Sequence, residues 1–152
     1  MKAELTYNEL FELQSIVSQI IKMEQKTKLN WACSNKNQKQ ISKHLKDYYD
    51  KIDDKKYEVA VTGKDKEILY DTLTIEGNVQ QVPKMSNEGR LKLKNFTKEL
   101  LTEKLEVELH QVPFESLNEK ELEQVNLVSE DTHKYLSYLI KDLPQYKEPE
   151  FI

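Results

Sequence analysis

The sequence predicts an α+β fold: a mostly helical single domain over residues 1–152 with a small antiparallel β-sheet. Apolar residues recur at helical spacing in four segments, and shorter segments alternate apolar and polar residues as strands do. The chain has 152 residues, of which 38% are hydrophobic, enough for one core but not for two independent ones. Residues 144–152 follow the last helical pattern as a short acidic, aromatic tail.

The first helix is predicted to begin at Thr6. Thr6 and Glu9 have the spacing of a capping box, in which the hydroxyl accepts from the first turn and the carboxylate reaches back. The apolar residues that follow recur at helical spacing and are Leu10, Leu13, Val17, Ile20 and Ile21. We expect this face to pack against two neighbours.

A longer helix is predicted from Trp31 to Lys56, with Asn30 as its N-cap. Its apolar stripe is narrow and consists of Ile41, Leu45, Tyr48 and Ile52. Four lysines lie nearly opposite that stripe: Lys36, Lys39, Lys43 and Lys46. We therefore expect these lysines to face water.

The next segment predicts strands. Residues 57–61 alternate with a period of two, and residues 62–65 are rich in turn formers. Residues 68–75 form a β-favouring run that Glu76-Gly77-Asn78 would end. A small hairpin of these two strands is the expected result.

A third helix is predicted over residues 87–102, after the break at Pro83 and Ser86. Residues 105–109 then show the clearest alternation of the chain, with leucine and valine on one face and glutamates on the other. Ser129 is predicted to cap a last helix that runs to Leu143, where Pro144 stops it.

Composition excludes several classes of protein. The 23 basic and 27 acidic residues nearly balance, so no global field attracts nucleic acid or a membrane surface. Cys33 is the only cysteine, which excludes an internal disulfide and favours a reducing compartment. No apolar run approaches the roughly 20 residues that span a bilayer, and Glu9 and Glu12 interrupt any signal-like segment. These features predict a soluble, cytoplasmic protein without membrane contact.

The sequence contains no recognisable catalytic or metal site. His44, His110 and His133 lack metal-ligand spacing, and no nucleophile motif surrounds Cys33, which is better explained as a small buried residue. The three glycines are isolated, so no phosphate-binding glycine loop is present. We expect no enzyme activity, no catalytic residue, no metal and no cofactor.

The charge distribution leaves nucleic-acid binding as an alternative. Residues 22–56 contain ten lysines and five acidic residues, whereas residues 103–152 contain five lysines and twelve acidic residues. A surface of Trp31 with Lys36, Lys39, Lys43 and Lys46 could stack a base and follow a phosphate backbone. Because acidic residues interrupt the stripe and the protein is net acidic, a solvated helix face is the favoured interpretation.

The C-terminal end is the predicted partner surface. On the last predicted helix, Tyr138 points away from the apolar face, so we expect it to be exposed. Beyond Pro144 the tail adds Tyr146, Phe151 and Ile152 among acidic residues. Aromatic anchors with an acidic rim suit a basic protein partner. The competing interpretation is that these side chains fold back onto the domain's own core.

The layout resembles a family of small proteins from phages of low-GC bacteria that is described only as a domain of unknown function. The resemblance covers about residues 5–117 and rests on general features: Tyr7-Asn8-Glu9-Leu10 in an early helix, Asn37, Leu45 and Tyr49 in a long lysine-rich helix, and the late segments 99–101 and 105–112. It implies no activity. It implies a context, since small phage proteins without catalytic motifs commonly bind a host, defence or virion protein.

The leading hypothesis is a non-enzymatic interaction protein or inhibitor, phage-encoded and acting in the host cytoplasm, that binds a protein partner. One alternative is a protein that sequesters a nucleotide-like ligand with lysines and tyrosines, and another is nucleic-acid binding through the Lys36–Lys46 face. The sequence leaves homo-oligomer formation and the identity of the partner open.

Overall fold

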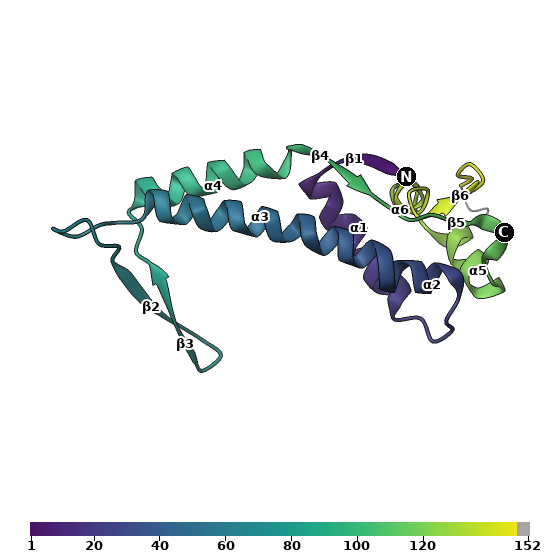
Figure 1. Cartoon of the computed structure of the whole chain (residues 1–152), viewed down its shortest axis with the longest axis horizontal. Coiled ribbons are helices and arrows are strands. Elements are labelled where there is room, and N and C mark those ends of the chain that lie inside the picture. The colour runs from purple at the N-terminus through teal and green to yellow at the C-terminus, as the bar shows by residue number, and fades with distance from the viewer. Residues whose placement is uncertain (149–152) are drawn as a thin grey trace. The chain divides into compact units, whose positions relative to one another are not determined.

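The computed structural model describes residues 1–148, which group into two compact units (Figure 1). Unit 1 comprises Met1–Leu45 and the described chain from Lys104 onward, and unit 2 comprises Lys46–Glu103. The chain passes from unit 1 into unit 2 within helix α3 (Gln38–Val59) and returns after Glu103. The expectation of one domain over residues 1–152 stays a prediction.

The predicted fold class is confirmed. The structure is 55% helical and 20% strand, with small antiparallel sheets, as a mostly helical α+β protein requires. Within residues 1–148, no helix has both the length and the apolar character needed to cross a membrane.

In unit 1, helix α1 (Tyr7–Ile21) begins at the predicted capping box. Thr6 Oγ1 accepts from the Glu9 N–H at 3.1 Å, and Glu9 Oε1 accepts from the Thr6 N–H at 3.1 Å. The predicted apolar face of this helix is buried, and its buried members are Leu10, Leu13, Val17 and Ile20. The local sequence therefore determines both where this helix starts and which face it buries.

Strand β1 (Lys2–Thr6) pairs antiparallel with β4 (Lys104–Glu108), Ala3 opposite Val107. The predicted alternation of β4 is confirmed, because Val107 is buried while Glu106 and Glu108 are exposed. Strand β1 was not predicted from the sequence. Its partner lies about a hundred residues away, so the local sequence contains little sign of the pairing.

The second predicted helix starts earlier than expected. It consists of α2 (Lys28–Ala32), one π-helical turn η1 (Cys33–Asn37) and α3, and the cap of α2 is Thr27, which accepts from the Asn30 N–H at 3.2 Å. The prediction of Asn30 as the N-cap is wrong. Asn30 is 2% exposed, and its Nδ2 donates to Ile20 O at 2.8 Å and Ile21 O at 3.2 Å. It therefore satisfies the last carbonyls of α1, because a buried amide needs such partners.

A second buried amide fixes the chain after β4. Asn37 Nδ2 donates to His110 O at 3.0 Å, and Asn37 Oδ1 accepts from the His110 N–H at 2.7 Å. These two hydrogen bonds satisfy the backbone N–H and C=O of His110, as a neighbouring strand would. It joins the π-helical turn to the segment that leads into β5 (Val112–Pro113).

The C-terminal part of unit 1 differs from its prediction. A 3₁₀ turn η2 (Phe114–Ser116) leads to helix α5 (Glu119–Leu127), which was not predicted although Asn118 and Glu121 form a capping box. Helix α6 (Glu130–Leu136) has the predicted Ser129 cap.

The prediction that α6 runs to Leu143 is wrong, because the helix ends at Leu136. Residues 137–139 form a turn, and β6 (Ile140–Lys141) pairs in parallel with β5. Asp142 then has a φ of 62°, which helical backbone does not allow.

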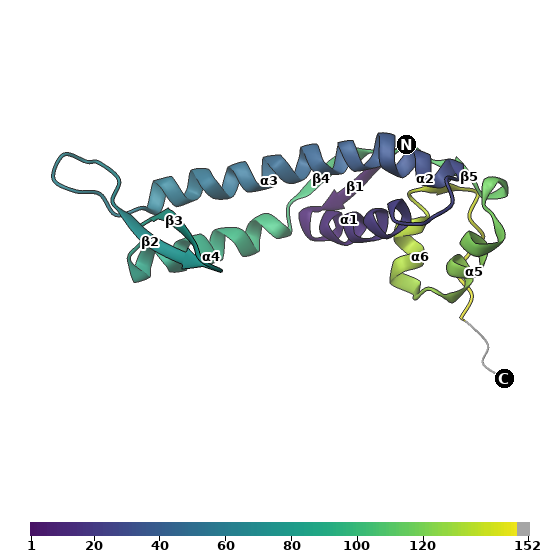
Figure 2. The ribbon, with the colours of Figure 1, turned by 90° about the horizontal axis from the view of Figure 1, so that it is seen from below.

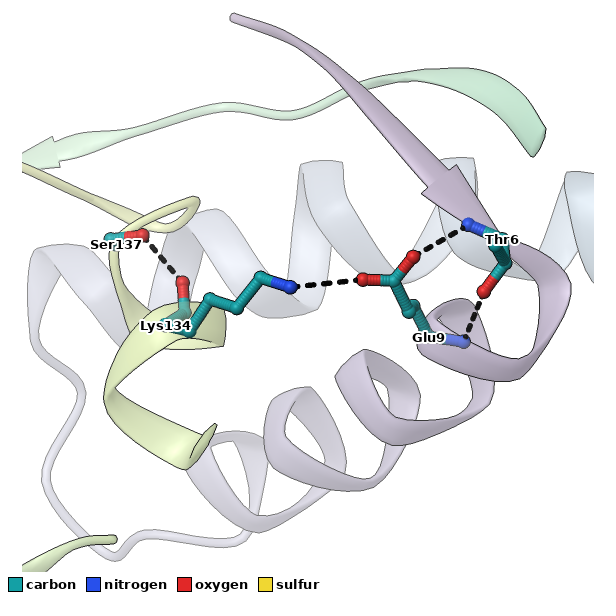
Figure 3. A network of polar contacts seen from close by, with 4 residues as sticks. All are labelled: Thr6, Glu9, Lys134 and Ser137. Carbon is teal, nitrogen blue, oxygen red and sulfur yellow. Dashed lines mark hydrogen bonds and ion pairs between the residues drawn. The ribbon is translucent and has the colours of Figure 1, made fainter. Parts of the chain in front are cut away.

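One ion pair joins α6 to the start of α1 (Figure 3). Lys134 Nζ lies 3.2 Å from Glu9 Oε2, the second oxygen of the capping-box carboxylate. The hydrogen bond with the Thr6 backbone, together with Lys134, lowers the pKa of Glu9, although partial burial opposes this. The Ser137 hydroxyl donates to Lys134 O at 2.5 Å and so ends the helix on which this lysine lies.

In unit 2, helix α4 (Asn87–Leu101) runs beside the second half of α3, as both views show (Figures 1 and 2). The N-cap of α4 is Ser86, one of the two residues at which the sequence predicts a break before this helix, and its Oγ accepts from the Gly89 N–H at 3.0 Å. Lys55 Nζ lies 5.4 Å from the Phe96 ring centroid, a cation–π contact between the two helices.

The predicted strand over residues 57–61 is wrong, because α3 continues to Val59 and only isolated β-bridges follow at Ala60 and Thr62. Tertiary packing overrides the local period here. A Cβ at Gly89 would lie 2.9 Å from Val59 O, so glycine allows the first turn of α4 to approach the end of α3 closely.

Candidate protein-binding hairpin

The β-hairpin of unit 2 consists of β2 (Tyr70–Ile75) and β3 (Asn78–Pro83), paired antiparallel from Tyr70↔Pro83 to Ile75↔Asn78. The sequence predicted the first strand but assigned it the wrong partner. Residues 57–61 form no strand, and the chain there meets the predicted strand through the bridge Thr62↔Ile68 and the hydrogen bond from Leu69 N–H to Val61 O. Strand β3 was missed because Gln80 and Gln81 interrupt its apolar pattern.

A two-residue turn connects the strands. Glu76 has a φ of 50° and Gly77 a φ of 81°, as a type I′ turn requires at its two central positions. This turn type matches the right-handed twist of paired strands, and glycine occupies the second position without strain. The turn therefore fixes the register of the hairpin.

Backbone hydrogen bonds anchor the base of the hairpin. Val61 N–H donates to Lys84 O at 2.8 Å, Leu69 N–H to Val61 O at 3.0 Å, and Lys84 N–H to Leu69 O at 2.8 Å. Tyr57, near the end of α3, also hydrogen-bonds Tyr70, and this contact raises the pKa of the Tyr70 hydroxyl. These contacts hold the start of β2 and the end of β3 in place, so the hairpin is anchored to the rest of unit 2.

Almost the whole hairpin is exposed. Every residue of β2 is exposed, and in β3 only the last two residues are half-buried. Figure 1 shows the hairpin standing away from α3 and α4 within unit 2. Four large apolar side chains on these strands keep much of their surface in water: Val79 (68% exposed), Ile75 (49%), Tyr70 (47%) and Leu73 (43%).

These apolar residues occupy both faces of the hairpin. Directly opposed residues share a face, so Leu73, Ile75 and Val82 lie on one side. Tyr70 and Val79 lie on the other side. A half-buried strand pair would place its apolar residues on one face only. Neither face of this hairpin is packed against a core.

The hairpin also lacks the usual protection against strand pairing. Exposed edge strands commonly carry lysines, bulges or inward charges. Residues 70–83 contain no lysine or arginine, and their only charged residues are Asp71 and Glu76. The register contains no bulge, and Pro83 lies at the far end of β3. Both outer edges can therefore accept another strand.

Of the C-terminal residues predicted as the partner surface, Tyr138 and Tyr146 are described and are only partly exposed. Tyr138 is half-buried in the turn after α6, with its ring centroid 6.5 Å from that of Tyr135. Tyr146 is half-buried against His133 at 5.6 Å, and His133 Nε2 lies 2.9 Å from Pro144 O. The tail therefore packs on unit 1 at least as far as Tyr146. Phe151 and Ile152 lie outside the described residues.

The lysine stripe faces water, as predicted. Lys36, Lys39 and Lys43 are exposed in unit 1, and Lys46, the first residue of unit 2, is exposed as well. Trp31 is 53% exposed, and Lys36 Nζ lies 6.0 Å from its ring centroid. Beside Trp31 is a shallow groove of about 270 Å³ that Lys28, His110 and Pro113 also line. These residues supply an aromatic ring and cations but no enclosed pocket for a phosphate.

The residues weighed as catalytic do not come together. Burial raises the pKa of the Cys33 thiol to about 12, so the nucleophilic thiolate is disfavoured. The His110 residue is exposed, and the His133 ring contacts Pro144 O of the tail. Within residues 1–148, no group of three or more histidine, cysteine, aspartate or glutamate side chains is placed to hold a metal ion.

Comparisons of the chain with protein-family models, curated proteins and solved structures found no match. The arrangement of the described residues is thus the basis for a functional argument. The hairpin is the feature that the sequence did not identify as a site. Two signals could have found it: the Glu76-Gly77-Asn78 turn and the absence of lysine and arginine from residues 70–83.

Proposed function

We propose that this chain is a non-enzymatic protein-binding protein that uses the β2–β3 hairpin to pair with a strand of its partner. The observation that carries the proposal is the exposure of apolar side chains on both faces of a two-stranded sheet with two open edges. Strand addition of this kind takes its affinity from main-chain hydrogen bonds and its specificity from alternate side chains.

The energetics favour a hairpin that is completed by another chain. An isolated two-stranded hairpin is marginally stable in water, and a third strand adds hydrogen bonds and covers apolar surface. Each Å² of apolar surface removed from water contributes roughly 25 cal/mol. Val79 and Ile75 are the most exposed apolar side chains of the hairpin and would contribute most to this term.

The chemistry of the edge favours a neutral or basic strand. Asp71 and Glu76 are the only charged residues between Tyr70 and Pro83, so a strongly acidic segment would meet repulsion. The general resemblance to small phage proteins favours a host, defence or virion protein as the source of that strand.

Affinity capture with matched variants tests the proposal. Tagged wild-type protein and a Leu73→Lys/Val79→Lys double variant are incubated with a lysate of the source cells or their host, and each co-purifying protein is quantified. Both substitutions lie on exposed positions, so we expect thermal unfolding to change little. We expect capture of the partner to fall at least about tenfold, because charges enter a desolvated interface.

Two control variants make the result specific. Leu127→Lys changes a leucine of unit 1 that is 72% exposed, and Lys39→Gln/Lys43→Gln removes part of the lysine stripe. We expect both controls to capture the partner at the wild-type level. Equal capture by wild-type protein and the hairpin variant would refute the proposal, and loss of capture in the lysine variant would transfer the binding role to that stripe.

A further inference from the structure

We infer that the outer edge of β3 pairs with β3 of a second copy of this chain, which leaves the β2 edge for the partner protein. The inference rests on the proposed role of the hairpin as the docking element. It assigns one of the two open edges to a defined occupant, and it joins two hairpins into a four-stranded sheet in the order β2-β3-β3-β2.

The register identifies which backbone groups of β3 point outward. Next to the ladder, Lys84 N–H donates to Leu69 O, which is one of the two bonds of a hydrogen-bonded pair, and bonded and non-bonded pairs alternate along an antiparallel ladder. The pairs of Val79 and Gln81 with their β2 neighbours are therefore of the non-bonded kind. Pro83, which has no N–H, also falls in such a pair, as it must.

Two-fold symmetry, together with the use of all outward groups of Val79 and Gln81, then selects one register. If Gln80 lies opposite Gln80 of the second copy, Val79 pairs with Gln81 of that copy, and Gln81 with its Val79. Each of these pairs exchanges two backbone hydrogen bonds, so all the outward N–H and C=O groups of Val79 and Gln81 are used. The two Gln80 side chains come close in a non-bonded pair, and an amide carries both donors and an acceptor, so it complements its own copy.

Charge distinguishes β3 from β2 as the edge for self-pairing. Residues Asn78–Pro83 carry no charge, so two β3 edges meet without repulsion. A β2–β2 pairing that used the outward groups of Tyr70, Thr72 and Thr74 would centre on Thr72. It would then place Asp71 of the two copies on one face at diagonal positions, about 7–8 Å apart, where the two like charges repel each other. The neutral edge therefore favours the second copy.

Proline substitutions separate the two edges. Gln81→Pro removes an N–H that points outward and is not used between β2 and β3, and Thr72→Pro does the same on the opposite edge. We expect sedimentation equilibrium over a concentration series to show a monomer–dimer equilibrium for the wild type. Gln81→Pro should raise the dimer dissociation constant at least about tenfold, because symmetry removes two donors at once. Thr72→Pro should leave the dimer unchanged.

A cysteine variant gives an independent readout. Gln80→Cys should form a disulfide-linked dimer rapidly with diamide as oxidant, because opposed residues of a non-bonded pair have Cα atoms about 4.5 Å apart, within the range of a disulfide. Thr72→Cys is the matched control and should form no disulfide-linked dimer, because the inferred dimer does not bring the two copies of residue 72 together. The native Cys33 is fully buried and should not interfere.

A wild-type protein that sediments as a monomer at every concentration would overturn the inference, as would a dimer that Thr72→Pro disrupts while Gln81→Pro does not. Preferential cross-linking of Thr72→Cys would overturn it too. The proposed function fails separately, by unchanged capture of the partner in the Leu73→Lys/Val79→Lys variant. If the wild type is monomeric and the Leu73→Lys/Val79→Lys variant loses capture of the partner, the pairing with a second copy is refuted and the proposed function is not.

Discussion

Unit 1 and unit 2 differ in how much apolar surface they bury. Among the described residues with buried hydrophobic side chains, only Tyr48 and Leu100 belong to unit 2, and all the others belong to unit 1. Unit 1 combines α1, α2 and the β1–β4 pair around side chains such as Leu5, Leu10 and Leu13. Unit 2 instead presents apolar residues to water, most clearly on its hairpin.

This difference indicates a division of roles. A region with few buried contacts opens at low free energy cost, and binding elements are commonly drawn from such regions. Unit 1 has the packed core that stabilises the fold. In unit 2, the hairpin is held by its turn, by the pairing of β2 with β3 and by the backbone hydrogen bonds of Val61, Leu69 and Lys84. Its surface stays available for a partner.

The largest expected effect compares two leucines. Leu13 is completely buried in α1, and Leu73 is exposed in β2. Leu13→Ala should lower the free energy of unfolding by about 2–5 kcal/mol, since it leaves a cavity. Leu73→Ala should change it by less than about 0.5 kcal/mol. Urea unfolding followed by circular dichroism measures both, and similar losses in the two variants would contradict the contrast between the units.

A smaller effect is expected at the close contact inside unit 2. In Gly89→Ala the new methyl group would lie 2.9 Å from Val59 O, a backbone atom that cannot move freely. We expect a loss of about 1–3 kcal/mol, the usual cost of overpacking. Asn95→Ala, at an exposed position of α4, is the control and should be neutral or slightly stabilising. A neutral Gly89→Ala would mean that α4 does not approach α3 this closely.

The smallest effect concerns Glu9 in unit 1. Its pKa is lowered in the folded protein, so its contribution to stability is complete above its ordinary value of 4.5 and is lost as the pH falls through the lowered value. Thermal unfolding between pH 7 and acid should therefore show a smaller acid-induced loss in Glu9→Gln than in the wild type. Glu12→Gln, an exposed position on the same helix, is the control. Identical pH profiles for Glu9→Gln and wild type would exclude this role.

The sequence predicted the elements that have local signals. The capping box at Thr6, the cap at Ser129 and the alternation of β4 are short-range patterns, and all three are present in the structure. Long-range features were missed. Strand β1 depends on a distant partner, and Asn30 caps the end of another helix rather than the start of its own. Neither relation appears in the residues adjacent to it in the chain.

The candidate site was harder to predict than the fold. A run such as Thr72-Leu73-Thr74-Ile75 predicts a strand with one buried face, and nothing in it indicates that both faces stay in water. The aromatic tail was the more obvious surface from sequence. The structure instead packs Tyr146 against His133, a contact between residues that no local period relates.

Amide hydrogen exchange, resolved by residue in dilute protein, tests the central claim most directly: the hairpin is an open, unpacked docking element. We expect the outward amides of Thr72, Thr74, Val79 and Gln81 to exchange fastest, and the paired amides of Leu73 and Gln80 more slowly. All six should exchange much faster than the amides of the buried face of α1. Outward hairpin amides as protected as those of Leu13 and Val17 would contradict the account, because the edges would already be covered within the single chain.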